Sequence, residues 1–315
     1  MPAVCSAAAP AVKLIAEVKG FASPESVATD GKLYYVSNVG KDLKPTAKDG
    51  DGFISRMGLG GEDLELRFIE GLNAPKGMLV HQEMLLVCDV DVLLGFDLAT
   101  RKKTLEISFA KDGVEFLNDI CAATGGRFFV SATDKNTIYL VDPKDGSAKP
   151  LTLDKKPNGP NGLEFVEVDG DSYLLVAEWG GGEKPDGLIQ AYQLDGSLLK
   201  GEWQEPDDDF PVKPGYKDGI ALYTVDGQPR GVLHSDWVDF KPGGKVLLLK
   251  EEEALIALPL PGAPLGGPAD FHFCAKTSVL ALPCMLDGRV LLVQLKPARP
   301  EPVEAPPPAG EGESS

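Results

Sequence analysis

The segment Pro160-Asn161-Gly162-Leu163 is one of six short segments in which polar or small residues lead into an apolar residue. The other five are Pro24-Glu25-Ser26-Val27, Pro75-Lys76-Gly77-Met78, Leu117-Asn118-Asp119-Ile120, Lys217-Asp218-Gly219-Ile220 and Pro268-Ala269-Asp270-Phe271. The copies follow one another at intervals of about 42 to 57 residues, a period typical of propeller blades. The chain is therefore expected to contain six repeated units.

Each copy is followed by the same kind of sequence. Short β-branched and aliphatic runs, such as residues 33–36 and 173–176, alternate with turns rich in Gly, Asp, Asn and Pro. Four units place a polar residue at a strand end about 13 to 18 residues after the second residue of the segment: Asn38, Asp89, Glu178 and Asp236. No segment shows a sustained helical period, so the sequence predicts an all-β chain.

Six such units predict a six-bladed β-propeller, because a single blade cannot cover its own apolar faces and ring closure removes the exposed ends. We expect residues 12–18 to close the ring by pairing with residues 290–295. The predicted organisation is a short N-terminal segment (1–11), the propeller (12–296) and a disordered Pro- and Glu-rich tail (297–315). Two separate all-β domains are the structural alternative.

Composition argues against several classes of partner and site. The chain carries 31 Lys and Arg against 48 Asp and Glu, a formal charge of −17, which repels nucleic acids and anionic membranes. No apolar run approaches the roughly 20 residues of a membrane span. Five cysteines without a CxxC pair predict reduced, mostly buried thiols rather than disulfides or a thiolate zinc site. We predict a cytoplasmic monomer, or a periplasmic or secreted one if the start of the chain has been trimmed.

The repeated segments also predict a site. The first strand of each propeller blade lines the central channel, so equivalent residues of the six segments are expected to converge on the axis. We call this set the ring: Glu25, Lys76, Asn118, Asn161, Asp218 and Ala269. Four members, Glu25, Asn118, Asn161 and Asp218, offer hard oxygen atoms, which suit Ca²⁺ or Mg²⁺ better than soft metals. We expect a cation there, chiefly Ca²⁺, with Mg²⁺, Mn²⁺ and Zn²⁺ as alternatives.

In this order, the segments around Glu25, Asn118, Asn161 and Asp218 resemble the senescence marker protein/gluconolactonase (regucalcin-like) family over about residues 20 to 295. The resemblance implies a six-bladed propeller with a divalent cation, usually calcium, in its channel, and hydrolysis of lactones or sometimes phosphotriesters. It also implies that Glu25, Asn161 and Asp218 ligate the metal, with Asn118 binding metal or substrate beside them.

The chain departs from the family pattern at three places. Lys76 puts an ammonium in the ring, where it would hold a substrate oxyanion or weaken the cation site. Ala269 offers no ligand, and His272 lies where phosphatase relatives place an imidazole, although an ordinary strand histidine is the simpler interpretation. His81 and His234 have no partner visible in the sequence.

These features predict a calcium-dependent hydrolase that opens a small lactone or ester. Asp218 is expected to act as general base or nucleophile, with Lys76 assisting at the oxyanion. The alternative is a propeller that binds calcium or a ligand without turnover. Specificity is expected in the longer loops, near residues 40–52 and 200–216.

Three other motifs are interpreted as structural. Residues 49–52 (Asp-Gly-Asp-Gly) lack the glutamate of a calcium loop and predict a hairpin turn. Trp179 and Trp237 are expected to pack between blades, with a role at the channel rim as the alternative. Residues 207–209 (Asp-Asp-Asp) are expected to form a solvated loop.

Overall fold

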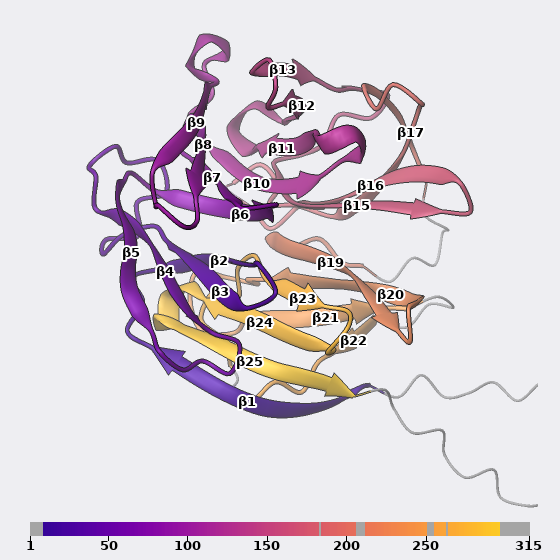
Figure 1. Cartoon of the computed structure of the whole chain (residues 1–315). Helices are drawn as coiled ribbons and strands as arrows, with labels where there is room; N and C mark the ends of the chain where they lie inside the picture. The colour runs from indigo at the N-terminus through magenta and orange to yellow at the C-terminus, as the bar shows by residue number, and fades with distance from the viewer. Residues whose placement is uncertain (1–8, 183, 206–211, 251–254, 263, 297–315) are drawn as a thin grey trace, which may run out of the picture.

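Six antiparallel sheets surround a central axis in the computed structural model (Figure 1), which describes residues 9–182, 184–205, 212–250, 255–262 and 264–296. Each inner strand contacts the inner strand of the next sheet, and the sixth contacts the first. The described residues contain no α-helix, only short 3₁₀ turns: Ala110–Asp112, Thr124–Gly126, Thr133–Lys135 and Met285–Asp287. The predicted six-bladed β-propeller is confirmed, and two separate β domains are excluded.

The blades are numbered from the N-terminus, and their strands are given from the axis outward. They are β2 (Pro24–Thr29), β3 (Leu33–Asn38), β4 (Gly52–Gly58) and β5 (Glu65–Leu72); β6 (Pro75–His81), β7 (Met84–Asp89), β8 (Val92–Asp97) and β9 (Lys103–Ser108); β10 (Leu117–Ala122), β11 (Phe128–Ala132), β12 (Thr137–Asp142) and β13 (Ser147–Pro150); β15 (Pro160–Val168), β16 (Asp171–Glu178), β17 (Ile189–Leu194) and β18 (Lys200–Trp203); β19 (Lys217–Val225), β20 (Gln228–Asp236), β21 (Lys245–Leu249) and β22 (Leu255–Ala257); and β23 (His272–Cys274), β24 (Val279–Cys284), β25 (Arg289–Lys296) and β1 (Ala11–Lys19). A further short strand, β14 (Thr152–Leu153), pairs in parallel with β18.

The propeller is closed by strands from the two ends of the described chain. In Figure 1 the indigo strand β1 lies beside the yellow strand β25, with Val12 opposite Leu295 and Val18 opposite Val290. The sixth blade is thus built from both ends of the sequence, as the pairing of residues 12–18 with 290–295 predicted. Separating the blades would require breaking this ladder first.

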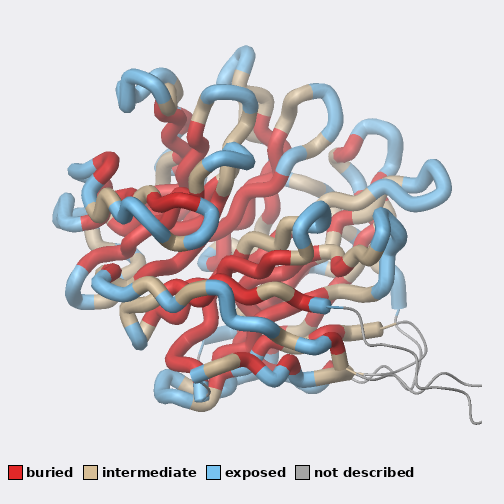
Figure 2. Tube along the Cα trace, turned by 60° about the horizontal axis from the view of Figure 1, so that its bottom comes forward, coloured by how far each residue is buried: buried red, intermediate tan, exposed pale blue. Residues whose placement is uncertain are grey.

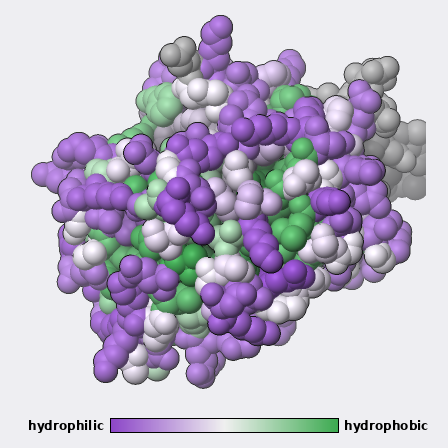
Figure 3. Space-filling model, turned by 90° about the horizontal axis from the view of Figure 1, so that it is seen from above, coloured by the Kyte–Doolittle hydropathy of each residue, from purple (hydrophilic) through white to green (hydrophobic). Residues whose placement is uncertain are grey.

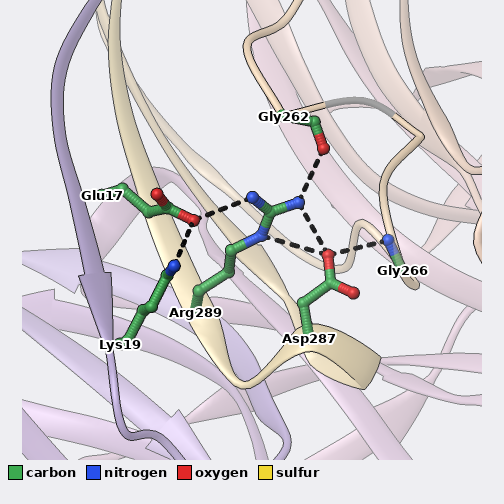
Figure 4. A network of polar contacts seen from close by, with 6 residues as sticks. All are labelled: Glu17, Lys19, Gly262, Gly266, Asp287 and Arg289. Carbon is green, nitrogen blue, oxygen red and sulfur yellow. Dashed lines mark hydrogen bonds and ion pairs between the residues drawn. The ribbon is translucent and has the colours of Figure 1, made fainter.

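A polar clasp reinforces the closure (Figure 4). The Arg289 guanidinium on β25 donates to Glu17 of β1 at 2.9 Å, to Asp287 at 2.8 Å and to the Gly262 carbonyl at 2.9 Å. Asp287 also accepts the Gly266 backbone N–H at 3.0 Å. Because the Arg289 side chain is largely buried, the clasp is screened less by solvent than a surface ion pair.

The hydrophobic core consists of layers between neighbouring sheets. Six clusters of buried apolar side chains each draw on two adjacent blades, including the pair formed by the sixth and first blades. Figure 2 shows the buried segments in the interior of the molecule and the exposed segments mostly in loops at its periphery. On the face shown in Figure 3, hydrophilic side chains predominate and apolar ones appear only in small patches.

The described cysteines carry no disulfide. Cys88, Cys121 and Cys284 are buried and Cys274 is partly buried, as free thiols; Cys5 and the proposed tail at 297–315 lie outside the described residues. No helix among the described residues is long and apolar enough to cross a membrane.

Substitution of Arg289 tests whether the clasp stabilises the closed propeller. We expect Arg289→Gln to lower the free energy of unfolding by about 1–3 kcal/mol, because it removes the cation that donates charge-assisted hydrogen bonds to Glu17 and Asp287. Lys103→Gln breaks the solvent-exposed Lys103–Glu106 pair and should cost about 0–1 kcal/mol. Urea unfolding of both variants measures the difference, and equal losses would show that the clasp adds nothing to closure.

Candidate functional site

The repeated segments lie in β-bulges at the start of the inner strands. In the first blade Pro24 pairs with Asn38 and Val27 with Val36. Two residues of β2, Glu25 and Ser26, therefore lie opposite one residue of β3. The same slip occurs in β6, β10, β15 and β19. A bulge bends its strand and re-aims the side chain it carries, and this geometry turns five ring residues toward the axis.

Glycine at the second bulge position lets neighbouring inner strands touch backbone to backbone. A Cβ atom on Gly162 would lie 2.2 Å from the Asp218 carbonyl oxygen, and one on Gly77 would lie 2.5 Å from that of Asn118. Both distances are far below van der Waals contact. The Gly that follows a ring residue is therefore set by packing against the next blade, and it brings adjacent ring residues close together.

Serines on the second strands hold the bulges in place. Ser131 Oγ accepts the Asp119 backbone N–H at 2.9 Å and donates to the Asn161 carbonyl oxygen at 2.7 Å, which links two blades. Ser235 does the same between the Gly219 N–H at 2.8 Å and the Ala269 carbonyl at 3.1 Å. The backbone that carries the ring is thus fixed by hydrogen bonds.

The strand-end polar residues found in the sequence have a structural task. Asp89 accepts the Ala74 backbone N–H at 2.7 Å, and Glu178 accepts that of Asn158 at 2.9 Å. Each acceptor fixes the loop that enters its own inner strand. In the fifth blade Asp236 instead forms a buried ion pair with Lys217, the residue before Asp218.

The ring residues with polar side chains meet at one cavity. Glu25, Lys76, Asn118, Asn161 and Asp218 are buried and line a space of about 220 Å³ at one end of the channel. Ala269 is buried at the same end, packed with other apolar residues, and offers no ligand. The structure therefore brings together every residue that the sequence proposed for metal binding or catalysis.

Four oxygen atoms at this cavity lack a partner. Glu25 Oε2, Asn118 Oδ1, Asn161 Oδ1 and Asp218 Oδ1 are buried, and none accepts a hydrogen bond from the described residues. Buried polar atoms are nearly always paired, and unpaired ones cost free energy. Four unpaired oxygens in one place, two of them on carboxylates, suit a hard divalent cation. These four oxygens are of the kind that calcium prefers. No group of three acids, histidines or cysteines among the described residues could hold a metal, so the site needs the two asparagine amides as well as the two acids.

Burial dominates the electrostatics of the ring. It raises the pKa of Asp218 to about 8, with the Asp119 charge adding to the effect and the Trp237 hydrogen bond opposing it. Burial and the charges of Asp218 and Asp270 hold the pKa of Glu25 well above its usual range. A bound cation would favour the ionised forms of Glu25 and Asp218 and so offset this repulsion.

Trp237 fixes the orientation of the Asp218 carboxylate. Its indole Nε1–H donates to Asp218 Oδ2 at 2.8 Å, which leaves Oδ1 as the unpaired atom. Trp237 and Trp179 follow strands of adjacent blades and pack on each other, as predicted, and both also line the cavity, as the alternative of a channel-rim role predicted. The available signal was their position, directly after the strand-end residues Asp236 and Glu178.

Lys76 reaches the ring with its ammonium already engaged. Its Nζ donates to the carbonyl oxygens of Pro45 at 2.9 Å and Ala74 at 2.8 Å, and lies 5.0 Å from the centre of the Phe116 ring. Burial lowers the pKa of Lys76, and the Glu25 carboxylate opposes this shift. An ammonium has three hydrogens, so one remains for another acceptor.

Two acids that the sequence analysis did not select lie one residue beyond the ring. Asp119 accepts the backbone N–H groups of Ile120 and Leu163 at 2.7 Å each, and Asp270 accepts the Ser26 hydroxyl at 2.5 Å. Burial raises the pKa of Asp119 to about 6 and that of Asp270 well above its usual range. Because protein donors satisfy them, they are structural acids, and they line a second cavity of about 560 Å³ at the other end of the channel.

The histidines lie away from the ring. His272 lies in β23, lines the second cavity and faces the Tyr34 ring, and His81 packs edge-on against Phe128. His234 is fully buried in β20, and neither ring nitrogen has a partner. Burial and the nearby Lys217 charge lower its pKa to about 3.

One of the two loops proposed for specificity contributes residues to the ring cavity. Leu43 and Pro45, from the connection between β3 and β4, line the ring cavity, as expected for residues 40–52. Residues 49–51 lie in this long connection rather than in a tight hairpin, with β4 beginning at Gly52. The acidic run at 207–209 lies outside the described residues.

No protein-family model and no curated protein matches this sequence. The fold resembles several solved structures. A luciferin-regenerating enzyme matches with a TM-score of 0.63 and 15% identity, over 90% of this chain and 95% of that one. A virginiamycin B lyase from Staphylococcus aureus matches with a TM-score of 0.57 and 11% identity, over 90% and 100%. The protein U3-55K matches with a TM-score of 0.53 and 11% identity, over 86% and 80%. Two of these three proteins are enzymes by name, and at such identities the likeness establishes the fold alone.

The close approach of the inner strands gives a test. We expect Gly162→Ala to lower the free energy of unfolding by about 2 kcal/mol or more, because the methyl group must push the fifth blade away. Gly196→Ala is the matched control, since a Cβ there meets nothing within 4 Å. Chemical denaturation of both variants decides, and equal stability would contradict the packing requirement.

His234 predicts a pH dependence. Its pKa falls from 6.5 to about 3 on folding, so the unfolded chain binds the proton more tightly and this histidine destabilises the fold as pH falls below about 6.5. We expect His234→Leu to gain stability relative to the wild type, by about 1.4 kcal/mol per pH unit between pH 6 and 4. Denaturation curves measure it, with pH 8 as the baseline; a constant difference at all pH values would refute it.

Proposed function

We propose that the protein is a divalent-cation-dependent hydrolase of a small lactone or ester, with Ca²⁺ held by Glu25, Asn118, Asn161 and Asp218. The observation that carries the proposal is the set of four buried, unpartnered oxygen atoms around one cavity. The enzymes among the structural relatives agree with catalysis on this fold but do not determine the reaction.

The chain's own groups suit hydrolysis. A bound divalent cation would supply the positive charge that polarises the substrate carbonyl. The Asp218 carboxylate, oriented by the Trp237 indole N–H at Oδ2, would take a proton from water as the water oxygen bonds to the carbonyl carbon. The acyl C–O bond then breaks and the leaving alkoxide receives that proton. One water is consumed and, from a lactone, one hydroxy acid is released.

Lys76 is proposed to assist at the oxyanion. Two of its three ammonium hydrogens are engaged by the carbonyls of Pro45 and Ala74, which fix the direction of the third. A fixed donor of this kind stabilises negative charge without reorganisation. The same engagement also favours the second candidate, a non-catalytic calcium-binding propeller in which Lys76 serves only to anchor the loop containing Pro45.

The central test is Asp218→Asn. The amide keeps the shape of the side chain and an oxygen for the Trp237 indole, so the fold should persist, while calcium-dependent lactone hydrolysis should fall by about 10²-fold or more. The control is Asp226→Asn, an exposed residue at the opposite end of the same β19–β20 hairpin. Turnover and the melting temperature are measured for both, and undiminished turnover would remove Asp218 from the mechanism.

Metal analysis separates the two candidate functions. Purified protein is analysed for bound metals, then assayed against lactones, esters and phosphotriesters with and without a chelator. Hydrolysis that is lost with chelator and restored by calcium supports the hydrolase. Tight calcium binding without hydrolysis of any substrate supports the binding module.

A further inference from the structure

The wall between the ring and solvent is apolar. Above the ring oxygens, the cavity is lined by Leu43, Phe116, Trp179, Trp237, Phe240 and Met285, together with the Pro45 ring. Three of these aromatic residues pack on one another: Trp179 lies 5.3 Å from Trp237 and 5.9 Å from Phe240, and Trp237 lies 5.8 Å from Phe240, between ring centres. We call Trp179, Trp237 and Phe240 the aromatic wall.

The aromatic wall runs from solvent to the ring. Phe240 is 56% exposed and Trp237 only 3%, so the wall begins at the surface and ends at the Asp218 carboxylate. Tyr216 supports it from behind, 5.0 Å from Trp179 and 5.4 Å from Phe240. Stacked and edge-to-face aromatic contacts of this kind hold the side chains in place.

This wall offers few hydrogen bonds. The Trp237 indole N–H is donated to Asp218, and two of the three hydrogens of the Lys76 ammonium are donated to backbone carbonyls. Apart from the amides of the ring, the side-chain N–H donors that this leaves among the described lining residues are the Trp179 indole N–H above the ring and the third hydrogen of Lys76. A ligand with several hydroxyl groups would lose its hydrogen bonds to water on entry without regaining them, which disfavours binding.

The volume sets the size of the ligand. An apolar cavity of about 150 Å³ is enough to bind benzene, and the cavity lined by the ring and the apolar residues above it is about 220 Å³. A compact ligand of about two fused six-membered rings matches this space, whereas a long acyl chain would extend into solvent.

Building on the proposed hydrolysis, we propose that the substrate is a compact lactone or ester with an apolar, ring-containing body, not a polyhydroxylated sugar lactone. The apolar body lies against the aromatic wall, and the carbonyl faces the ring oxygens. This assigns the aromatic wall as the specificity-determining surface of the site.

Three δ-lactones with the same ring size test the proposal. In isochroman-3-one the ring is fused to benzene, δ-valerolactone is bare, and in glucono-δ-lactone the ring carries hydroxyl groups. We expect kcat/KM for isochroman-3-one, corrected for uncatalysed hydrolysis, to exceed that for glucono-δ-lactone by tenfold or more, with δ-valerolactone between them, because burying apolar surface favours the fused ring. Equal values, or a preference for glucono-δ-lactone, would overturn the proposal.

Two variants locate the preference. Phe240→Ser removes an exposed part of the aromatic wall and should reduce the ratio of isochroman-3-one to δ-valerolactone activity by about threefold or more. Val238→Ser changes another exposed apolar residue of the same loop, which does not line the cavity, and it should leave the ratio unchanged. If Phe240→Ser also leaves the ratio unchanged, the aromatic wall does not set specificity.

A binding measurement separates this proposal from the proposed function. The ketone 2-tetralone has the shape of isochroman-3-one but no bond to hydrolyse, and its binding is followed by quenching of tryptophan fluorescence. If no lactone is hydrolysed but 2-tetralone binds, and binds more weakly to Phe240→Ser, the apolar site stands and the hydrolase assignment fails. If 2-tetralone does not bind to the wild type or binds equally to Phe240→Ser, the apolar site is refuted, whatever the lactone activity.

Discussion

The close approach of neighbouring inner strands around the axis is the constraint on which the rest of the structure depends. Because Gly162 has no side chain, the backbone of the fifth blade passes where its Cβ would be. The same contact at Gly77 brings the second and third blades together. Only at this separation can the apolar faces of adjacent sheets fill the space between them, and only then do the bulges project their side chains into one cavity.

The close approach of the inner strands also buries several acidic side chains near one another, and these acids fall into two groups. Asp119 and Asp270 are compensated by backbone N–H groups and a serine hydroxyl, so their burial is compatible with a stable fold. Glu25 and Asp218, together with the amides of Asn118 and Asn161, each keep an oxygen with no such compensation. The difference between compensated and uncompensated oxygens distinguishes the acids that support the channel from those proposed to bind a cation.

The aromatic wall extends from solvent to the ring. It makes the proposed site more selective among ligands than the ring residues alone would be. A ring of carboxylates and amides would accept many oxygen-containing ligands, because a bound cation polarises any carbonyl or phosphoryl oxygen. The apolar residues above it restrict what can approach. The three solved structures share only 11–15% identity with this chain, so the likeness establishes the fold, and the argument for selectivity rests on the residues of this chain.

The sequence by itself determined the number of blades, the closing pair of strands and the chemistry of the ring residues, because each depends on periodic local patterns. The ring residues recur at one position of the repeat, and equivalent positions in a closed propeller lie at a common height on the axis. The tertiary structure decided which oxygens stay unpaired, that Trp237 binds Asp218, that Lys76 is held by Pro45 and Ala74, and that an aromatic wall stands above them. These contacts join segments from different blades, whose distances are set by packing between sheets and leave no periodic trace along the chain.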